Sequence, residues 1–246
     1  LEVPTGAKKP DGSDVTVTID WDGNQRLGVS AQNAELHLLD FLHLQGSFFW
    51  EKGPQQLVEI ATGIPANLGA ALDTIGLDGI ASAIAGVAGV TIGPNFSTIS
   101  GWDVATTMLG MSNVQGFAGF GSPDFSDPDW ATRDNLLGFI LSGVNLALGI
   151  MNSTFPIGIP GLETFIGLSA SVGTAAFTAY GSDWLTVEAS DVEIVINDNP
   201  DNWPGGIGPA VIDWAATDWN QGDETEPGLE VPTGAKKPDG SDVTVT

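Results

Sequence analysis

Apolar and polar residues alternate over much of the chain, which is the pattern of a half-buried β-strand. In the segment AELHLLDFLHLQGSFFW, residues 34–50, the even positions are apolar or small except at Asp40. They therefore form one apolar face of period two. A straight strand of this length would reach roughly 55 Å, which is longer than usual. We therefore expect a bend near Leu39–Asp40.

In several places the apolar side chains change from odd to even positions, or from even to odd. The segments are SAQNAEL, SGVNLAL, ASVGTAA and EASDVEI, at residues 30–36, 142–148, 170–176 and 188–194, with a weaker copy, MSNVQGF, at residues 111–117. One extra residue keeps the apolar side facing inward after such a change, so each segment predicts a β-bulge or a corner. Asn, Gly and Asp suit these corners because they tolerate left-handed backbone angles.

Corners that recur within one domain favour a mainly all-β fold, an elongated stack of strands similar to a β-solenoid. The turns WDGN at residues 21–24 and YGSD at residues 180–183 are typical of hairpins. They favour the alternative, a bulged antiparallel β-sandwich.

One segment interrupts the alternation. Leu68, Leu72 and Ile75 recur at roughly helical spacing, and Pro65 suits the first turn of a helix. We expect a small helical insertion at about residues 65–89 that caps an end or an edge of the sheet.

The chain contains the same stretch twice. LEVPTGAKKPDGSDVTVT occurs as residues 1–18 and again, without one change, as residues 229–246. We interpret the chain as a slice through an array whose repeat unit is 228 residues (229 − 1). An appended copy is the alternative. In the array interpretation, residues 1–13 are an inter-repeat linker, residues 14–215 are the β-rich repeat domain, and residues 216–246 are the linker and the start of the next repeat.

Charge and composition exclude several kinds of partner. Seven basic and 31 acidic residues give a net charge of −24, which does not fit binding to nucleic acid or to an anionic membrane surface. The most apolar run, residues 80–93, is too short to span a bilayer, so we expect no membrane insertion. The chain has no cysteine, which excludes disulfides, thiolate catalysis and cysteine-type zinc sites.

Aspartates gather in three loops of a kind that offers oxygen ligands to Ca²⁺. The candidate ligands are Asp11, Asp14, Asp20, Asp22, Asp124, Asp127, Asp129, Asp198 and Asp201. No loop has the EF-hand pattern, and solvated turns are the alternative interpretation. The first and third loops flank the expected linker, so Ca²⁺ bound there would stiffen the joint between repeats.

Other candidate chemistry is sparse. His37 and His43 lie on the polar side of the alternation, and six residues of one strand would separate them by about 20 Å. We therefore expect surface histidines that do not share a metal. The eight tryptophans suit core or edge packing, or stacking on sugars where they are exposed. The chain has neither a nucleophile elbow nor a phosphate-binding loop, and we expect no catalysis.

Three segments, residues 42–53, 138–151 and 167–197, resemble the repeats of very large bacterial extracellular proteins. Those adhesin-like chains often carry haemolysin-type (RTX) calcium repeats elsewhere. The resemblance implies a secreted, cell-surface or matrix setting and a structural or adhesive role, and it carries over no catalytic residue. The segment GGIGPAVID, residues 205–213, starts like a calcium-binding nonapeptide but has Ala210 where the aspartate belongs.

Together these features predict a structural or adhesive spacer module of a giant tandem-repeat bacterial surface or secreted protein, with Ca²⁺ as a candidate stiffening ion. Its partners would be the neighbouring repeats, and cell-surface glycans or the surface of another cell. The alternatives are a carbohydrate-binding module and a β-solenoid enzyme that degrades polysaccharide. Arrays of near-identical repeats usually serve length or avidity, which argues against the enzyme.

Overall fold

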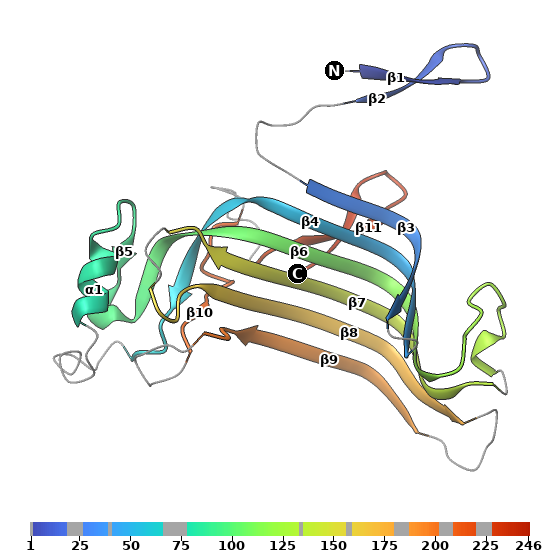
Figure 1. Cartoon of the computed structure of the whole chain (residues 1–246). Helices are drawn as coiled ribbons and strands as arrows, with labels where there is room; N and C mark the ends of the chain where they lie inside the picture. Colours follow the sequence, from blue (N-terminus) through green and yellow to red (C-terminus); the bar gives the residue numbers. More distant parts are fainter. Residues whose placement is uncertain are drawn as a thin grey trace.

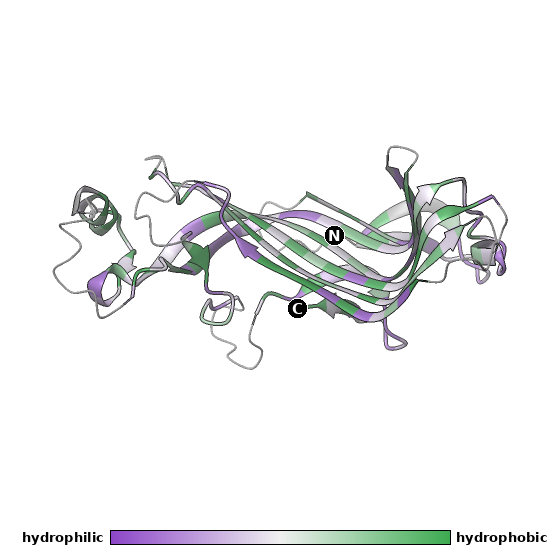
Figure 2. Cartoon of the chain, turned by 90° about the horizontal axis from the view of Figure 1, so that it is seen from below, coloured by the Kyte–Doolittle hydropathy of each residue, from purple (hydrophilic) through white to green (hydrophobic). Residues whose placement is uncertain are grey.

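The computed structural model describes residues 2–18, 27–38, 41–65, 78–132, 135–155, 159–179, 187–201, 209–219 and 228–246. Most of these residues form one long antiparallel sheet that bends strongly toward one end (Figure 1). In Figure 2 the same sheet is seen from below, with apolar and polar residues interspersed along its strands.

Five long strands lie side by side in the sheet. In spatial order they are β4 (Leu42–Ala61), β6 (Thr98–Phe120), β7 (Leu137–Ser153), β8 (Thr164–Ala179) and β9 (Glu188–Asp198). Three further strands complete it: β3 (Leu27–Leu38) and β10 (Val211–Ile212) pair with β4, and β5 (Thr91–Ile92) pairs with β6.

Every strand pair among the described residues is antiparallel, and none of the sheets closes on itself. The prediction of a mainly β fold is confirmed. The expected solenoid is not shown by these strands, eight of which lie in one open sheet. The hairpin predicted at residues 180–183 connects β8 to β9, which pair antiparallel, although its turn lies outside the described residues, as does the turn at residues 21–24.

The bend expected within residues 34–50 is a full reversal of the chain. β3 and β4 are adjacent strands of a hairpin, in which Leu38 lies opposite Leu42 and His37 opposite His43. The even positions still share one face, because residues of equal parity lie opposite each other in this register. A period of two survives both a bend and a tight reversal, so the pattern could not separate them.

The predicted corners lie at one level across the sheet, because their residues are opposite one another in the strand pairing. The left-handed backbone angles expected there occur at Asn113 (φ 49°), Gly143 (φ 64°) and Asp191 (φ 52°). The register of the β3–β4 pair shifts between Ala31 and Ala34, and that of the β6–β7 pair shifts next to Asn113. The corners in β3, β6 and β7 are thus confirmed as irregularities, because the β6–β7 register shifts a second time between Val114 and Gly116, which lie opposite Val144 and Leu141. The β7–β8 and β8–β9 pairs pass the same level without a shift.

The main core lies at the end of the sheet that carries α1 (Asp78–Ala85). Its largest fully buried side chains come from the sheet and from the segments that cover it: Ile60, Ile84, Ile99, Trp102, Met151, Leu162, Phe165 and Ile212. The helix α1 confirms a helical element within residues 65–89, of which residues 66–77 lie outside the described part. No helix among the described residues is long and apolar enough to cross a bilayer.

A smaller cluster lies at the opposite end of the sheet. Phe117 of β6 packs there with Trp130 and Leu136 from the connection between β6 and β7. Two 3₁₀ turns flank β6: η2 (Pro94–Phe96) precedes it, and η3 (Trp130–Thr132) follows it.

The two copies of the duplicated stretch form two separate two-stranded sheets. β1 (Glu2–Lys8) pairs with β2 (Asp14–Thr18), and β11 (Val231–Lys236) pairs with β12 (Asp242–Val245). The sequence predicts linker for much of both stretches, but the structure has regular hairpins there. The alternation of DVTVT favours extended chain, and the turn residues before it reverse the direction.

Candidate functional site: the hairpin seat

The two hairpins have the same internal structure. Val3 lies opposite Val17 in the first, and Val231 lies opposite Val245 in the second. Each hairpin has an ion pair of 2.6 Å at the same place, between Lys8 and Asp14 or between Lys236 and Asp242. The conformation of the hairpin therefore follows from its own 18 residues.

The turn explains why the hairpin is encoded locally. The carboxylate of Asp11 accepts hydrogen bonds from the amide and the hydroxyl of Ser13, at 2.9 and 2.7 Å. Asp239 accepts the same pair of bonds from Ser241, at 3.0 and 2.7 Å. In both turns the hydrogen bond from the serine side chain is the main cause that lowers the pKa of the aspartate. The glycine directly after each aspartate, Gly12 or Gly240, supplies the positive φ that the turn requires.

The surroundings of the two hairpins differ completely. Val3 is 40% exposed, whereas Val231 is 2% exposed and Thr233 is fully buried. In Figure 1 the β1–β2 hairpin stands clear of the sheet, and β11 lies across one side of it. We call the surface beneath β11, formed by β3, β4 and β6, the hairpin seat.

Glycines allow the close approach between hairpin and seat. A Cβ atom added to Gly110 of β6 would overlap the carbonyl oxygen of Pro232. Gly234 of the hairpin has φ +79°, and a Cβ atom there would overlap the carbonyl oxygen of Phe48 and approach that of Ala31 to 2.9 Å. The backbones therefore meet without intervening side chains, so the fit depends on glycine at both positions.

A buried polar contact fixes the hairpin in the seat. The hydroxyl groups of Thr233 and Ser112 are hydrogen-bonded at 3.1 Å, and the Thr233 hydroxyl also bonds to the carbonyl of Val243 at 2.8 Å. Both residues are buried. A buried hydroxyl needs a partner, so this contact specifies the register of the hairpin on the sheet.

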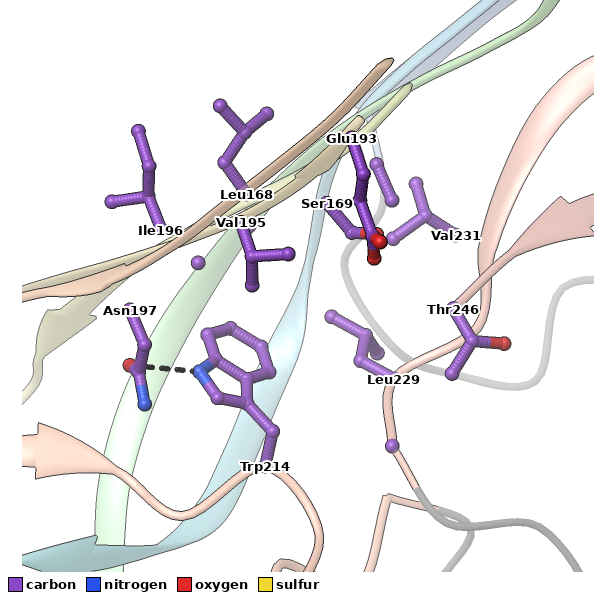
Figure 3. Close-up of a pocket in the computed structure, with 14 residues that line it drawn as sticks. Leu168, Ser169, Glu193, Val195, Ile196, Asn197, Trp214, Leu229, Val231 and Thr246 are labelled. Atoms are coloured by element: carbon purple, nitrogen blue, oxygen red, sulfur yellow. Dashed lines mark hydrogen bonds between the residues drawn. The ribbon is translucent and has the colours of Figure 1, made fainter. Parts of the chain in front are cut away.

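A cavity of about 310 Å³ opens beside the seat, between the hairpin and strands β7 to β9 (Figure 3). Trp214 lies in it against the bare backbone of Gly149 and Gly167, and its indole N–H donates to the side-chain oxygen of Asn197 at 3.0 Å. Leu229 lines the opposite side (Figure 3). The cavity is mainly apolar, and one wall belongs to the duplicated stretch.

Of the predicted calcium ligands in the first loop, Asp11 and Asp14 belong to the β1–β2 hairpin. Asp11 accepts from Ser13 and Asp14 pairs with Lys8, so both carboxylates serve the hairpin itself. Asp20 and Asp22 lie outside the described residues.

The second and third acidic loops use several carboxylates as turn acceptors. Asp124 accepts from Ser126 at 2.5 and 3.2 Å, and Asp127 accepts from the amide of Asp129 at 2.9 Å. Asp198 is an exposed residue at the end of β9. Asp201 accepts from the amide of Thr164 at 2.7 Å and thereby joins two neighbouring segments. Within the described residues no three acidic or histidine side chains form a metal-binding group.

The histidines differ from the expectation. His37 and His43 are not about 20 Å apart, because they lie opposite each other across the β3–β4 hairpin, with their Nδ1 atoms 3.0 Å apart. His43 is buried, whereas the side chain of His37 is about half exposed and has Glu35 at 3.7 Å. The error in the predicted separation follows from treating a hairpin as one strand.

Packing is the main role of the tryptophans that the structure describes. Trp102, Trp130 and Trp219 are buried, and Trp219 stacks on Trp214 with ring centroids 5.2 Å apart. The remaining one of these, Trp50, is partly buried in β4. The other three tryptophans lie outside the described residues.

Sequence reasoning found the duplication but missed the seat. The seat residues Gly110 and Ser112 of β6 are small, and the segment at residues 111–117 that contains Ser112 predicts a corner rather than a docking surface. The one available signal was a glycine in the interior of a long strand, which often marks a close approach by another backbone. Comparison of the chain with known protein families, with curated proteins and with solved structures finds no match.

Proposed function

We propose that the chain is a structural module of a tandem array in which the start of each following repeat packs onto the sheet of the repeat before it. One observation carries this proposal: the second copy of the duplicated stretch is docked in a seat that fits it closely, whereas the first copy is exposed. An appended copy with no role would have no reason to meet a buried hydroxyl, Ser112, and a glycine, Gly110, that match it.

Such a joint makes a stiff array. A flexible linker would let successive modules rotate, whereas a hairpin fixed by Thr233 and by the approach at Gly110 couples the two modules mechanically. In this proposal each module is a bulged antiparallel sheet covered by the next hairpin, closer to a sandwich than to a solenoid rung. A charge of −24 keeps so long an assembly soluble by self-repulsion.

The setting is part of the same proposal: a spacer or adhesive array of a giant bacterial surface or secreted protein, without catalysis. Calcium bound by the acidic loops would stiffen it further. Neighbouring repeats are the first partners, and glycans or the surface of another cell are the partners of the whole array.

A carbohydrate-binding module is the second candidate, and the cavity at Trp214 favours it. An indole beside the amide of Asn197 and the carboxylate of Glu193 combines a stacking surface with polar groups, which is the composition of a sugar site. However, the indole N–H is already bonded to Asn197, and Trp214 packs on Gly149 and Gly167. These contacts give Trp214 a packing role and place this candidate second.

The array is tested on the parent protein in the cells that produce it. Antibodies against the 246-residue chain should detect a protein far above 25.4 kDa, and limited proteolysis should give a ladder whose steps equal one 228-residue repeat (229 − 1). Protease applied to intact cells should remove the signal if the array lies at the surface. A single protein at the mass of the chain would overturn the array, and protection in intact cells would overturn the surface location.

A further inference from the structure

We infer that the hairpin seat is a binding site for residues 1–18 of a second copy of this chain. The inference rests on the proposed role of the hairpin as a joining element. Its experiment needs only the 246-residue chain, so it can fail while the array stands. The array can likewise fail while docking between copies is observed.

Sequence identity supplies the first argument. Every hairpin group that meets the seat has an identical counterpart in the first copy: Val3 for Val231, Thr5 for Thr233 and Gly6 for Gly234. The internal geometry of the two hairpins is also the same, with equal pairing and equal ion pairs. A seat that binds residues 229–246 should therefore also bind residues 1–18, because the two stretches present the same groups.

Exposure supplies the second argument. Val3 and Val17 are 40% and 57% exposed, although the same side chains in the second copy are buried or partly buried. An isolated two-stranded hairpin is marginally stable in water. The first hairpin therefore carries an apolar side that only a partner surface can cover, and the one surface shown to fit it is the seat.

The seat of the wild-type chain is filled by its own second hairpin. That hairpin is tethered, so its effective concentration at the seat far exceeds that of free chains. Docking between copies should therefore be seen only when the second hairpin is displaced. Each copy then offers one hairpin and one seat on different surfaces. Such a head-to-tail contact builds open chains rather than closed dimers.

The substitution Gly234→Val displaces the second hairpin and leaves the first intact. A Val side chain at φ +79° is strained and would overlap the carbonyl of Phe48. In sedimentation velocity at 150 mM salt, Gly234→Val should associate into a concentration-dependent series of dimers, trimers and larger chains. The wild-type chain should not form this series of head-to-tail chains over the same concentrations, because its seat is filled.

Two matched variants separate docking from non-specific association of an uncovered sheet. Gly6→Val/Gly234→Val has the same empty seat but lacks a hairpin that fits it, and it should be monomeric. Gly110→Val/Gly234→Val keeps the first hairpin but fills the seat with a side chain, and it should also be monomeric. Circular dichroism confirms that each variant retains the sheet. Association of the Gly6→Val/Gly234→Val variant to the same degree as Gly234→Val would overturn the inference.

Cross-linking locates the contact, because the chain has no cysteine of its own. Thr233 and Ser112 touch in the filled seat, so Thr5 of one copy should touch Ser112 of another. Thr5→Cys/Gly234→Val is mixed with Ser112→Cys/Gly234→Val under mild oxidation. A disulfide-linked dimer of the two variants is expected, and it should be lost when Gly6→Val is added to the first. Absence of this dimer, or a dimer that forms equally well when Gly6→Val is present, would overturn docking between copies.

Discussion

Val231 is 2% exposed and Val3 is 40% exposed, although the two residues occupy the same place in identical 18-residue stretches. Local sequence sets the pairing of both hairpins, so it cannot be the source of this difference. The difference comes from the seat, which covers one copy and leaves the other in water. The pairing within each hairpin therefore comes from its own sequence, and the burial of the second hairpin comes from the sheet.

Thiol labelling should report this difference directly. Cysteine placed at position 3 (Val3→Cys) should react with a water-soluble thiol reagent at the rate of an exposed thiol. Cysteine at position 231 (Val231→Cys) should react at least about tenfold more slowly, since it must wait for local opening. Because the immediate sequence is identical, each variant is the control of the other. Equal rates in the folded chain would contradict the docked state of the second hairpin.

Filling the close approach at Gly110 should destabilise the chain. Gly110→Ala places a methyl group against the carbonyl of Pro232, and overpacking of this kind costs about 1–3 kcal/mol in the free energy of unfolding. Gly79→Ala in α1 is the matched control, since its Cβ would meet nothing within 4 Å and alanine favours a helix. Urea unfolding followed by tryptophan fluorescence measures both. A Gly110→Ala chain as stable as the wild type would show that the hairpin does not press on the sheet.

The pKa values of the two turn aspartates, Asp11 and Asp239, should both be lowered, each by its own serine. Hydrogen bonds from Ser241 hold the pKa of Asp239 below its ordinary value of 3.8, and those from Ser13 do the same for Asp11. A lowered pKa in the folded state means that the carboxylate stabilises the turn above pH 3.8 and loses this effect as the pH falls through the lowered pKa. Carbon-detected NMR titration should find both values lowered. Ser241→Ala should raise the pKa of Asp239 toward 3.8 and leave that of Asp11 unchanged. If the pKa values of both Asp239 and Asp11 shifted in Ser241→Ala, the neighbouring serine would not be the cause of each lowered pKa.

The calcium proposal predicts a specific thermal shift. An ion that binds only the folded state raises the midpoint of unfolding by mass action, so millimolar CaCl₂ should raise it by several degrees over chelator. MgCl₂ at the same concentration is the control for screening of the acidic surface. An equal response to both ions, or no response to either, would contradict specific calcium binding. The aspartates would then serve only as hydrogen-bond acceptors within the chain, as Asp11, Asp124 and Asp201 do.

The change of apolar residues between odd and even positions predicted the corners of the sheet, because a pleated strand has only two faces. A change of face needs an extra residue or a special backbone angle, and Asn113, Gly143 and Asp191 provide the angle. The same rule could not reveal the β3–β4 hairpin. A reversal that keeps parity leaves His37 and His43 on one face, just as an unbroken strand does.

The seat could not be predicted because its two halves lie far apart in sequence. Ser112 and Thr233 are separated by 121 positions, and neither the corner segment around Ser112 nor the duplicated stretch around Thr233 indicates that they meet. The duplication singled out residues 229–246 but did not indicate where they pack. The alternation in β9 also misled, since it predicts a buried face where Ile194 and Ile196 are 48% and 42% exposed.

β9 is the last strand of the sheet among the described residues, and it carries exposed apolar side chains on both faces. Val195 is 69% exposed, with Ile194 and Ile196 pointing to the opposite face. An apolar edge strand with unpaired backbone groups is a template for pairing with another chain, and lysine on such a strand opposes it. Val195→Lys should therefore reduce light scattering at high protein concentration while changing the free energy of unfolding by no more than about 0.5 kcal/mol.

Glu193→Lys on the same strand is the control for charge. Both substitutions make the net charge of −24 less negative, which by itself weakens the repulsion between chains. A charge effect alone would therefore increase scattering in both variants, and more in Glu193→Lys. Reduced scattering in Val195→Lys alone would assign self-association to the apolar edge. Increased scattering in both would contradict that assignment and leave net charge as the factor that keeps the chain soluble.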